Sequence, residues 1–435
     1  MDLFDSPNFS DRVKALMQNN RVPGLSVAVI NGDKVKSAGY GFASVKSQEP
    51  CTADTLFDIA SSSKSLTAAA IALLVEDADF PEVQYGSIMS ELLPDDFVMS
   101  DELHTNTVTV DDLLGHHTGM PGKFLQERIF DRIDMASSSL QPESAKAIGH
   151  AHRLAKGHIW DKKSASYREF EAVNCPEGQG AGSVISSAND FIRFLKAIID
   201  RNGPITGMDL YWQGGHAVFG HSGDITGFGS RFVFLPDLKF GAVVMGNSSG
   251  TNSVAAQLFR EFIDTAIKSY TGPWPSTAIS NIGVHMSPPE GREKPNSESR
   301  SYAGGMTKTN AGRVKGKKED TSTIVGSSAT SQRDLTLEEY AGDYWNPGYR
   351  NMKVEIRDKG LFIDATDRSM GFTARLKHKR DQSVYDAHVR DAFNTGDEVL
   401  MTKFIIENGK VVKMGMDLEP LIGDLIWFEK VDNEQ

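Results

Sequence analysis

Apolar residues recur along the first part of the chain with two periods, which predict both helices and strands. Helical spacing appears in the following segments: 8–20, 61–76, 108–114, 123–135, the run after Ser187, and 252–268. Thr109 and Ser187 are the predicted N-caps of two of these helices. Continuous or alternating apolar runs predict strands over 24–30, 34–41, 230–235 and 240–245. Tight turns at 31–33 and 236–237 join these strands in pairs, so we expect hairpins in an antiparallel sheet that is packed by helices.

The pattern changes further along the chain. Residues 136–182 are polar and irregular, and residues 271–333 are rich in Ser, Thr, Gly, Lys and Pro, which is typical of a disordered linker. From Leu335 onward, short alternating segments and turns such as 408–409 predict a small all-β domain, either a meander or an open barrel. The expected divisions of the chain are 1–270, 271–333 and 334–435.

A Ser-x-x-Lys motif stands where a short apolar lead-in meets the second predicted helix. Its spacing puts Ser61 and Lys64 on one helical face, a single turn apart. A lysine in a dry pocket loses its proton more easily and can then act as a base toward a neighbouring serine. This is the arrangement of serine acyl-enzymes. The alternative is that Ser61 is only the N-cap of the helix, and the tetrapeptide alone does not separate the two.

Composition excludes several other functions. The 435 residues carry a formal net charge of −12, with a pI near 5.4, which argues against nucleic acid and anionic membranes as partners. Cys51 and Cys175 do not make a disulfide framework. His116 and His117 are adjacent on a turn without a carboxylate or Cys cluster, so we expect no metal site. There is no signal-peptide pattern or membrane-length apolar run, so we expect a soluble, cytoplasmic protein.

Several motifs occur in the same order as in a known superfamily. The chain resembles the serine β-lactamase, D-Ala-D-Ala carboxypeptidase and esterase superfamily, on its class C-like branch. The matching segments are 22–24, 57–64, 112–119, 181–190 and 221–223, in order over residues 21–250. The segment 339–344, with Asn346-Pro347-Gly348, looks like the lipocalin-like tail of many such proteins. The resemblance implies an α+β fold of the β-lactamase/transpeptidase type. It consists of an antiparallel sheet flanked by helices and of a truncated helical subdomain, and a small all-β barrel-like domain follows.

The resemblance also implies roles for particular residues. Ser61 is expected to attack an ester or amide carbonyl, with Lys64 as the close base. His221 stands where relatives carry the Lys of Lys-Thr-Gly. A histidine at this position is similar to the esterase and aminopeptidase members. Backbone N–H groups of Ser61 and Asp224 are expected to stabilise the oxyanion. The cleft residues implied are Ser222, Gly223 and Asp224, and no metal or cofactor is implied.

One expected motif is missing. Relatives carry Tyr-x-Asn after the His-Thr-Gly loop, and its Tyr relays a proton between nucleophile and leaving group. Here Gly122 passes directly into 123–130, which resembles the segment that lies after that motif in relatives, so a block of several tens of residues is absent. Tyr167 does not restore the pattern and is interpreted as a packing aromatic in an irregular loop. Either the sequence lacks an exon or the chain is a real deletion variant.

The expected activity is acyl transfer through a Ser61 ester. The substrate is a small ester, amide, lactam or D-amino-acid peptide, and the sequence does not choose among these or set the oligomeric state. Since His221 replaces Lys and no secretion signal is present, esterase or peptidase activity is favoured over β-lactamase activity. The alternative is a catalytically impaired pseudoenzyme or binding scaffold, because the Tyr-x-Asn block is missing.

A different enzyme class is suggested by residues 246–250, which fit Gly-x-Ser-x-Gly between a strand and a helix. An α/β-hydrolase also needs an acid and then a histidine after the nucleophile, on strands of a parallel sheet. Downstream of Ser248 the chain offers only His285, His378 and His388, and no βαβ alternation is present there. A structural strand-to-helix turn is the favoured interpretation of this motif.

Overall fold

The computed structural model describes most of the chain outside the long Ser- and Lys-rich segment. The described residues are 4–6, 8–94, 97, 102–114, 125–175, 178, 180–182, 184–201, 208–271, 335–368, 371–391, 398–418 and 424–431. The linker predicted at 271–333 therefore lies almost wholly outside the described residues. So does the junction at Gly122–Lys123, where the missing block is expected.

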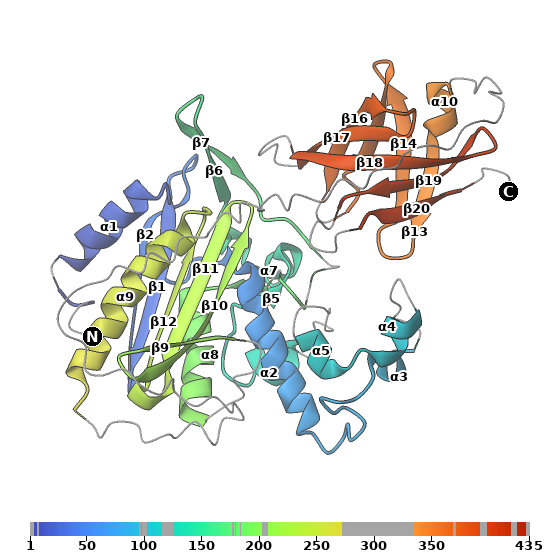
Figure 1. The fold of residues 1–435 in the computed structure, drawn as a ribbon. Coiled ribbons are helices and arrows are strands. Elements are labelled where there is room, and N and C mark those ends of the chain that lie inside the picture. Colours follow the sequence, from blue (N-terminus) through green and yellow to red (C-terminus); the bar gives the residue numbers. More distant parts are fainter. Residues whose placement is uncertain are drawn as a thin grey trace, which may run out of the picture. The chain divides into compact units, whose positions relative to one another are not determined.

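A seven-stranded antiparallel sheet forms the centre of the first folded region (Figure 1). Its strand order is β3-β2-β1-β12-β11-β10-β9. The strands are β1 (Gly24–Asn31), β2 (Lys34–Ser44), β3 (Glu49–Pro50), β9 (Asp209–Gln213), β10 (His216–Ile225), β11 (Phe228–Leu235) and β12 (Phe240–Gly246). The two predicted hairpins are confirmed, and they meet because β1 pairs with β12 from Leu25 to Asn31. This pairing brings the start of the chain next to the strands that come after residue 208.

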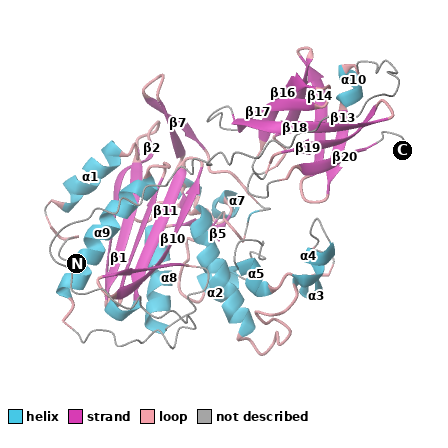
Figure 2. Ribbon diagram, in the orientation of Figure 1, coloured by secondary structure: helices cyan, strands magenta, loops and turns pink. Residues whose placement is uncertain are grey.

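Helices pack on both faces of this sheet (Figure 2). On one face, α1 (Phe9–Asn19) and α9 (Thr251–Ser269) share an apolar core with alternate residues of β1, such as Val27 and Val29. On the other face lies α8 (Ala188–Arg201), whose Ile199 approaches Ile30 across the glycine at 241. β1 is buried on both sides along most of its length, which explains its continuous apolar sequence.

The segment between β3 and α8 contains short elements, and two expectations about it were wrong. Residues 136–182 are not irregular, because they hold short strands and helical turns. Of the helical pattern predicted over 123–135, the described residues 125–135 form one π-helical turn followed by turns. The elements are β4 (Phe57–Asp58), η1 (Ala60–Ser62), α2 (Ser63–Val75), α3 (Met89–Leu92), α4 (Glu102–Thr107), α5 (Val110–Leu114), η2 (Gln126–Phe130), β5 (Ser139–Leu140), α7 (Pro142–Ala147), η3 (Ala151–Arg153), β6 (Gly157–Asp161), β7 (Ser166–Phe170) and β8 (Val184–Ser186).

The predicted helix caps are present. Ser187 Oγ accepts the backbone N–H of Asp190 at 3.1 Å and so caps α8. At the start of α5, Thr109 Oγ1 accepts the N–H of Asp112 at 3.2 Å while the Asp112 carboxylate accepts the N–H of Thr109 at 3.0 Å. This reciprocal pair is a capping box, so the short helix begins where the sequence predicts it.

The second folded region is a closed eight-stranded barrel, where a meander or open barrel was predicted. Closure depends on pairing of its first and last strands, with Asp343 opposite Val431 and Trp345 opposite Glu429. The interior is filled by buried side chains such as Tyr344 and Phe404. A helical turn, α10 (Leu337–Tyr340), precedes the barrel. The strands are β13 (Gly342–Asn346), β14 (Arg350–Arg357), β15 (Gly360–Ala365), β16 (Phe372–Arg380), β17 (Val384–Asp391), β18 (Glu398–Glu407), β19 (Lys410–Met416) and β20 (Ile426–Val431).

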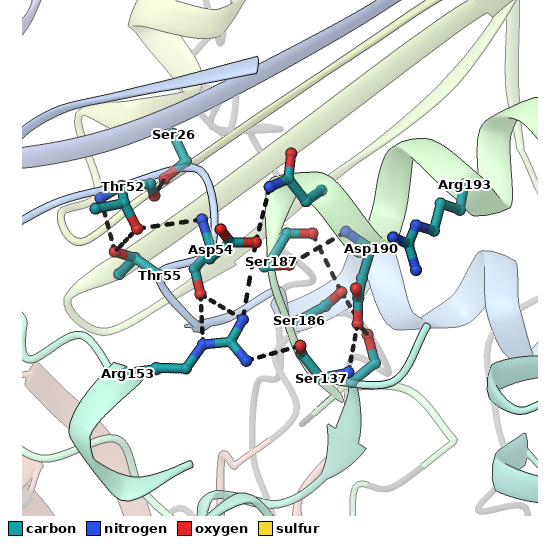
Figure 3. Close-up of polar contacts among 12 residues, drawn as sticks. Ser26, Thr52, Asp54, Thr55, Ser137, Arg153, Ser186, Ser187, Asp190 and Arg193 are labelled. Carbon is teal, nitrogen blue, oxygen red and sulfur yellow. Dashed lines mark hydrogen bonds and ion pairs between the residues drawn. The ribbon is translucent and has the colours of Figure 1, made fainter. Parts of the chain in front are cut away.

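A polar network joins α8 to the small three-stranded sheet β4-β8-β5 (Figure 3). The Arg153 guanidinium donates to the backbone oxygen of Asp54 at 2.8 and 3.0 Å and to Ser137 Oγ at 2.8 Å. The buried Asp190 carboxylate accepts the Ser137 N–H at 2.8 Å and the Ser138 hydroxyl at 2.9 Å. The carboxylate therefore fixes the residues that lead into β5, which in turn pairs with β8.

Asp190→Ala should destabilise this region, because the Ser137 N–H and the Ser138 hydroxyl lose their acceptor. We expect the free energy of unfolding in urea to fall by about 2 kcal/mol. The control is Asp200→Ala on the same helix, which removes only an exposed pair with Lys196 and should cost less than about 0.5 kcal/mol. Equal losses in the two variants would contradict this account of Asp190.

Candidate active site

Ser61 and Lys64 are in direct contact. Lys64 Nζ donates to Ser61 Oγ at 3.0 Å and to the backbone oxygen of Ala181 at 2.7 Å. Lys64 lies in the first turn of α2, and Ser61 lies in the 3₁₀ turn η1 immediately before it. Partial burial lowers the pKa of Lys64, because desolvation disfavours the charged ammonium. At a given pH the unprotonated amine next to the hydroxyl is therefore more populated than it would be in an exposed lysine.

The interpretation of Ser61 as an N-cap does not hold. The N-cap of α2 is Ser62, and neither η1 nor α2 has a side-chain capping hydrogen bond. Ser61 also differs from its neighbours in exposure, since Ser62 is 1% and Ser63 is 0% exposed while Ser61 is half-buried. Among Ser61, Ser62 and Ser63, Ser61 is thus the one whose side chain reaches the surface.

The neighbouring serines hold the backbone around Ser61. Ser230 Oγ on β11 donates to the backbone oxygen of Ile59 at 2.6 Å and lies 2.7 Å from Ser62 Oγ. Ser63 Oγ accepts the N–H of Val184 at 3.2 Å. These hydroxyls therefore bond β11 and β8 to the turn that carries Ser61.

The turn that leads into Ser61 has an unusual backbone. Ala60 has φ +46°, a left-handed conformation that a residue with a Cβ rarely adopts. Asp58 Oδ1 accepts the Ala60 N–H at 2.8 Å, which closes a turn two residues long. Strained backbone of this kind is concentrated at functional sites.

β10 lies against this turn at Gly223. A Cβ at this position would lie 2.1 Å from the backbone oxygen of Ile59 and 3.0 Å from the backbone nitrogen of Ser61, so only glycine permits the approach. Since side chains alternate along a strand, His221 lies on the same face of β10 as this approach. Ser222 and Asp224 lie on the opposite face.

The cleft residues have further polar contacts. His221 Nδ1 lies 2.7 Å from the backbone oxygen of Ser222, so in the neutral ring Nδ1 carries the hydrogen and Nε2 is the unprotonated nitrogen. Asn252 Nδ2 donates to the backbone oxygen of Gly223 at 2.9 Å. Burial raises the pKa of Asp224, and a contact with Asn252 opposes that rise.

One edge of β10 is open beside the predicted site. β9 pairs with β10 only from His216 to Gly220. Over 221–225 no other described strand pairs with β10 on that side. Backbone groups of this stretch can therefore bond to a ligand instead of a strand.

Sequence reasoning missed three groups at this site: the Asp58 carboxylate, the Ser230 hydroxyl and the backbone oxygen of Ala181. Asp58 had a local signal, because an Asp two residues before a turn residue favours an Asx-turn. The other two come from distant parts of the chain, and no local signal in the sequence indicates them.

Tyr167 packs as an aromatic residue, as interpreted, although it is not in an irregular loop. It lies on β7, with ring centroids 4.9 Å from Trp160 and 5.9 Å from His158. His158 is buried and lies 3.1 Å from the Glu169 carboxylate, so this hairpin has its own structural network. The segment 115–124, with His116 and His117, lies outside the described residues.

The Gly-x-Ser-x-Gly segment forms a structural turn. Ser248 is 6% exposed, and its Oγ donates to the backbone oxygen of Arg21 at 2.8 Å. The side chain of Asn247 accepts the Gly24 N–H at 2.7 Å and donates to the oxygen of Phe42 at 3.0 Å. The antiparallel sheet also excludes the α/β-hydrolase architecture.

The part of the chain that the structure describes bears on two further questions, metal binding and membrane spanning. The described residues contain no group of three or more His, Cys, Asp or Glu side chains that could hold a metal ion. None of their helices is both long enough and apolar enough to cross a membrane. Neither Cys51 nor Cys175 takes part in a disulfide.

Comparison with known families decides the assignment of the first region. The family model described as Beta-lactamase matches residues 9–124 and 121–265, which is more than half of the chain. The chain belongs to the Beta-lactamase family. A second model, a domain of unknown function (DUF3471), matches residues 327–430, which overlap the barrel.

Individual relatives agree with this membership of the β-lactamase family. An unguisins hydrolase of Aspergillus campestris (strain IBT 28561) is 25% identical over 515 positions, covering 97% of this chain and 91% of that protein. A β-lactamase of Pseudomonas fluorescens is 48% identical over 56 residues, 13% of this chain and 16% of that protein. The octameric penicillin-binding protein homologue from Pyrococcus abyssi has a TM-score of 0.51 at 16% identity, covering 98% of this chain and 100% of that one. At that identity the likeness concerns the fold alone.

The same comparisons bear on the missing block. The alignment with the Aspergillus protein runs over 515 positions, more than the 435 residues of this chain, so that relative has segments that this chain lacks. The β-lactamase family match is made in two parts that overlap at 121–124. This is the junction where the sequence predicts that a block is absent.

The ionisation of Asp58 gives a stability prediction. Burial raises the pKa of this carboxyl from 3.8 to about 6, so the folded state holds a proton that the unfolded state has released. Binding of this proton stabilises the folded state. The stabilisation is fully present below pH 3.8 and is lost as the pH rises through about 6. Asp58→Asn should remove this dependence. From pH 5 to pH 8, its free energy of unfolding should gain about 1.5 kcal/mol relative to the wild type.

Urea unfolding of both proteins at the two pH values measures this difference. A difference between variant and wild type that stays constant with pH would show that Asp58 has an ordinary pKa in the folded state.

Proposed function

We propose that this chain is a serine hydrolase of the β-lactamase family that works through a Ser61 acyl-enzyme. The observation that carries the proposal is the 3.0 Å hydrogen bond between Lys64 Nζ and Ser61 Oγ, at a half-buried lysine. A base within hydrogen-bond reach of the nucleophile is what covalent catalysis by serine requires.

In the proposed reaction, Ser61 Oγ attacks a carbonyl carbon and its proton passes to Lys64 Nζ. The tetrahedral intermediate carries a negative oxygen, which the backbone N–H groups of Ser61 and Asp224 stabilise. The C–N or C–O bond to the leaving group then breaks, and the leaving group takes a proton. Water hydrolyses the ester on Ser61, which restores the serine and releases the acid. The close approach of β10 to the Ser61 nitrogen at Gly223 supports this assignment of the oxyanion donors.

His221 is proposed to handle the proton on the leaving-group side. It is the titratable side chain that β10 places on the face that approaches Ser61, and its unprotonated Nε2 can accept a proton. An imidazole carries less fixed positive charge at neutral pH than the lysine of β-lactamases. Recognition of a β-lactam carboxylate is correspondingly weaker, so esterase or peptidase activity is favoured.

The proposed substrates are small esters, amides, lactams or peptides that contain D-amino acids. The relative aligned over most of its length is named as a hydrolase, which supports hydrolysis over acyl transfer. The open edge of β10 over 221–225 supports an extended substrate, because its backbone can bond to the strand.

A binding scaffold is the second candidate. It is favoured by one observation, the segments that the Aspergillus relative has and this chain lacks. If the absent block holds the proton-relaying Tyr, turnover should be slowed, since general acid–base help contributes about 10²–10⁴-fold. In that case Ser61 would still react with strong electrophiles, while hydrolysis of substrates would be slow.

Substitutions at Ser61 and Lys64 separate the hydrolase from the scaffold. We expect Ser61→Ala to abolish hydrolysis of a panel containing p-nitrophenyl butyrate, D-alanine p-nitroanilide and a chromogenic β-lactam. Lys64→Arg keeps the charge but cannot lose a proton, so the rate should fall by at least about 100-fold. Ser248→Ala is the matched control, and should retain activity.

Hydrolysis that survives Ser61→Ala and is lost with Ser248→Ala would overturn the assignment. No hydrolysis by the folded wild type, together with no covalent labelling by a fluorophosphonate, would support the scaffold instead.

A further inference from the structure

We propose that Asp58 is a positioning residue for the nucleophile. Its carboxylate holds Ala60 in the left-handed conformation and thereby sets the directions of the Ser61 N–H and hydroxyl. The inference rests on the proposed role of Ser61. It adds a residue that lies before the Ser-x-x-Lys motif and does not itself touch the reacting atoms.

Asp58 is anchored on its own side of the turn. It lies on β4, opposite Ile185 of β8, and it is 2% exposed. The next residue, Ile59, donates its N–H to the oxygen of Val184 at 3.0 Å. Pairing with β8 thus fixes the position of the Asp58 carboxylate, and the hydrogen bond from the Ala60 N–H fixes the turn relative to it.

The turn itself is held at several points. The oxygen of Ile59 accepts the Ser62 N–H at 3.1 Å and the Ser230 hydroxyl at 2.6 Å. The N–H of Ala60 has the Asp58 carboxylate as its partner at 2.8 Å. A left-handed conformation is unfavourable for alanine, so it persists only where such bonds impose it.

Among the described residues, the hydrogen bond to this carboxylate comes from the Ala60 N–H, and no cation supports its charge. No Lys, Arg or His in that part of the chain contributes to its ionisation, and the hydrogen bonds of Lys64 go to Ser61 and Ala181. Burying a carboxylate without a cation is unfavourable, and burial raises its pKa to about 6. What the charge provides is a stronger hydrogen bond to the Ala60 N–H than a neutral acceptor makes.

Small movements of this turn have a large consequence. At Gly223 the backbone of β10 already approaches Ile59 so closely that no side chain fits between them. A rotation at Ala60 would shift the Ser61 nitrogen relative to β10 and to Lys64 Nζ. Misplacement of a catalytic group by about 1 Å can cost about 100-fold in rate.

The test measures labelling of the full chain by a fluorophosphonate, with the maximal labelling rate and the half-saturating probe concentration determined separately. Asp58→Ala removes the acceptor, and should lower the maximal rate by about 10- to 100-fold with little change in half-saturation. Asp58→Asn keeps an acceptor oxygen and should stay within about threefold of the wild type. Asp58→Ala combined with Ala60→Gly should recover much of the loss, because glycine adopts positive φ without strain.

The control is Asp161→Ala. Asp161 Oδ1 accepts the N–H of Lys163 at 2.8 Å, so the variant loses the same kind of turn bond on the β6–β7 hairpin and should label at the wild-type rate. Thermal unfolding shows whether each variant is folded.

Equal labelling rates for folded Asp58→Ala and the wild type would overturn the role of Asp58 while leaving Ser61 as the nucleophile. If Asp58→Ala alone does not fold, the double variant Asp58→Ala with Ala60→Gly takes its place. A folded double variant that labels much more slowly than Asp58→Asn would also overturn the role of Asp58. Absence of labelling in the wild type would instead overturn the proposed function, and this role with it.

Discussion

The hydrogen bond between Lys64 Nζ and Ser61 Oγ is the interaction on which the proposed chemistry depends. This chemistry requires a lysine whose pKa is lowered by desolvation and a serine whose side chain still reaches the surface. The fold meets both needs at one turn, because Ala181 and the start of α2 enclose the lysine while the hydroxyls of Ser62 and Ser63 point into the protein. Ser61 alone in that run is left half-exposed.

The rest of the first region holds this turn in place from distant parts of the chain. β4 and β8 pair on one side of it, and the glycine of β10 closes against it on the other. β10 pairs with β11, β11 pairs with β12, and β12 pairs with β1. Two separate parts of the sequence therefore build one site, and membership of the β-lactamase family is consistent with that arrangement.

The sequence predicted those features whose signal is local. The hairpins, the caps at Thr109 and Ser187, and the spacing of Ser61 and Lys64 all depend on neighbouring residues, and the structure contains each of them. A two-residue strand such as β5 carries no periodicity, which is one reason why the expectation of irregular structure over 136–182 was wrong. Closure of the barrel depends on pairing of β13 with β20, far apart in the sequence, and no short-range pattern indicates it. The positive φ of Ala60 was missed because alanine usually favours the right-handed region.

The chain combines an intact Ser-Lys pair with a segment that is shorter than in its Aspergillus relative, so the central claim concerns whether the pair reacts. The most direct measurement is intact-mass and peptide mass spectrometry of the protein quenched during reaction with an ester, a β-lactam or a D-amino-acid peptide. The account predicts a mass increase equal to one acyl group, located on the peptide that contains Ser61 and absent in Ser61→Ala. Turnover of the substrate with no adduct on Ser61, or with the adduct on Ser248, would contradict it.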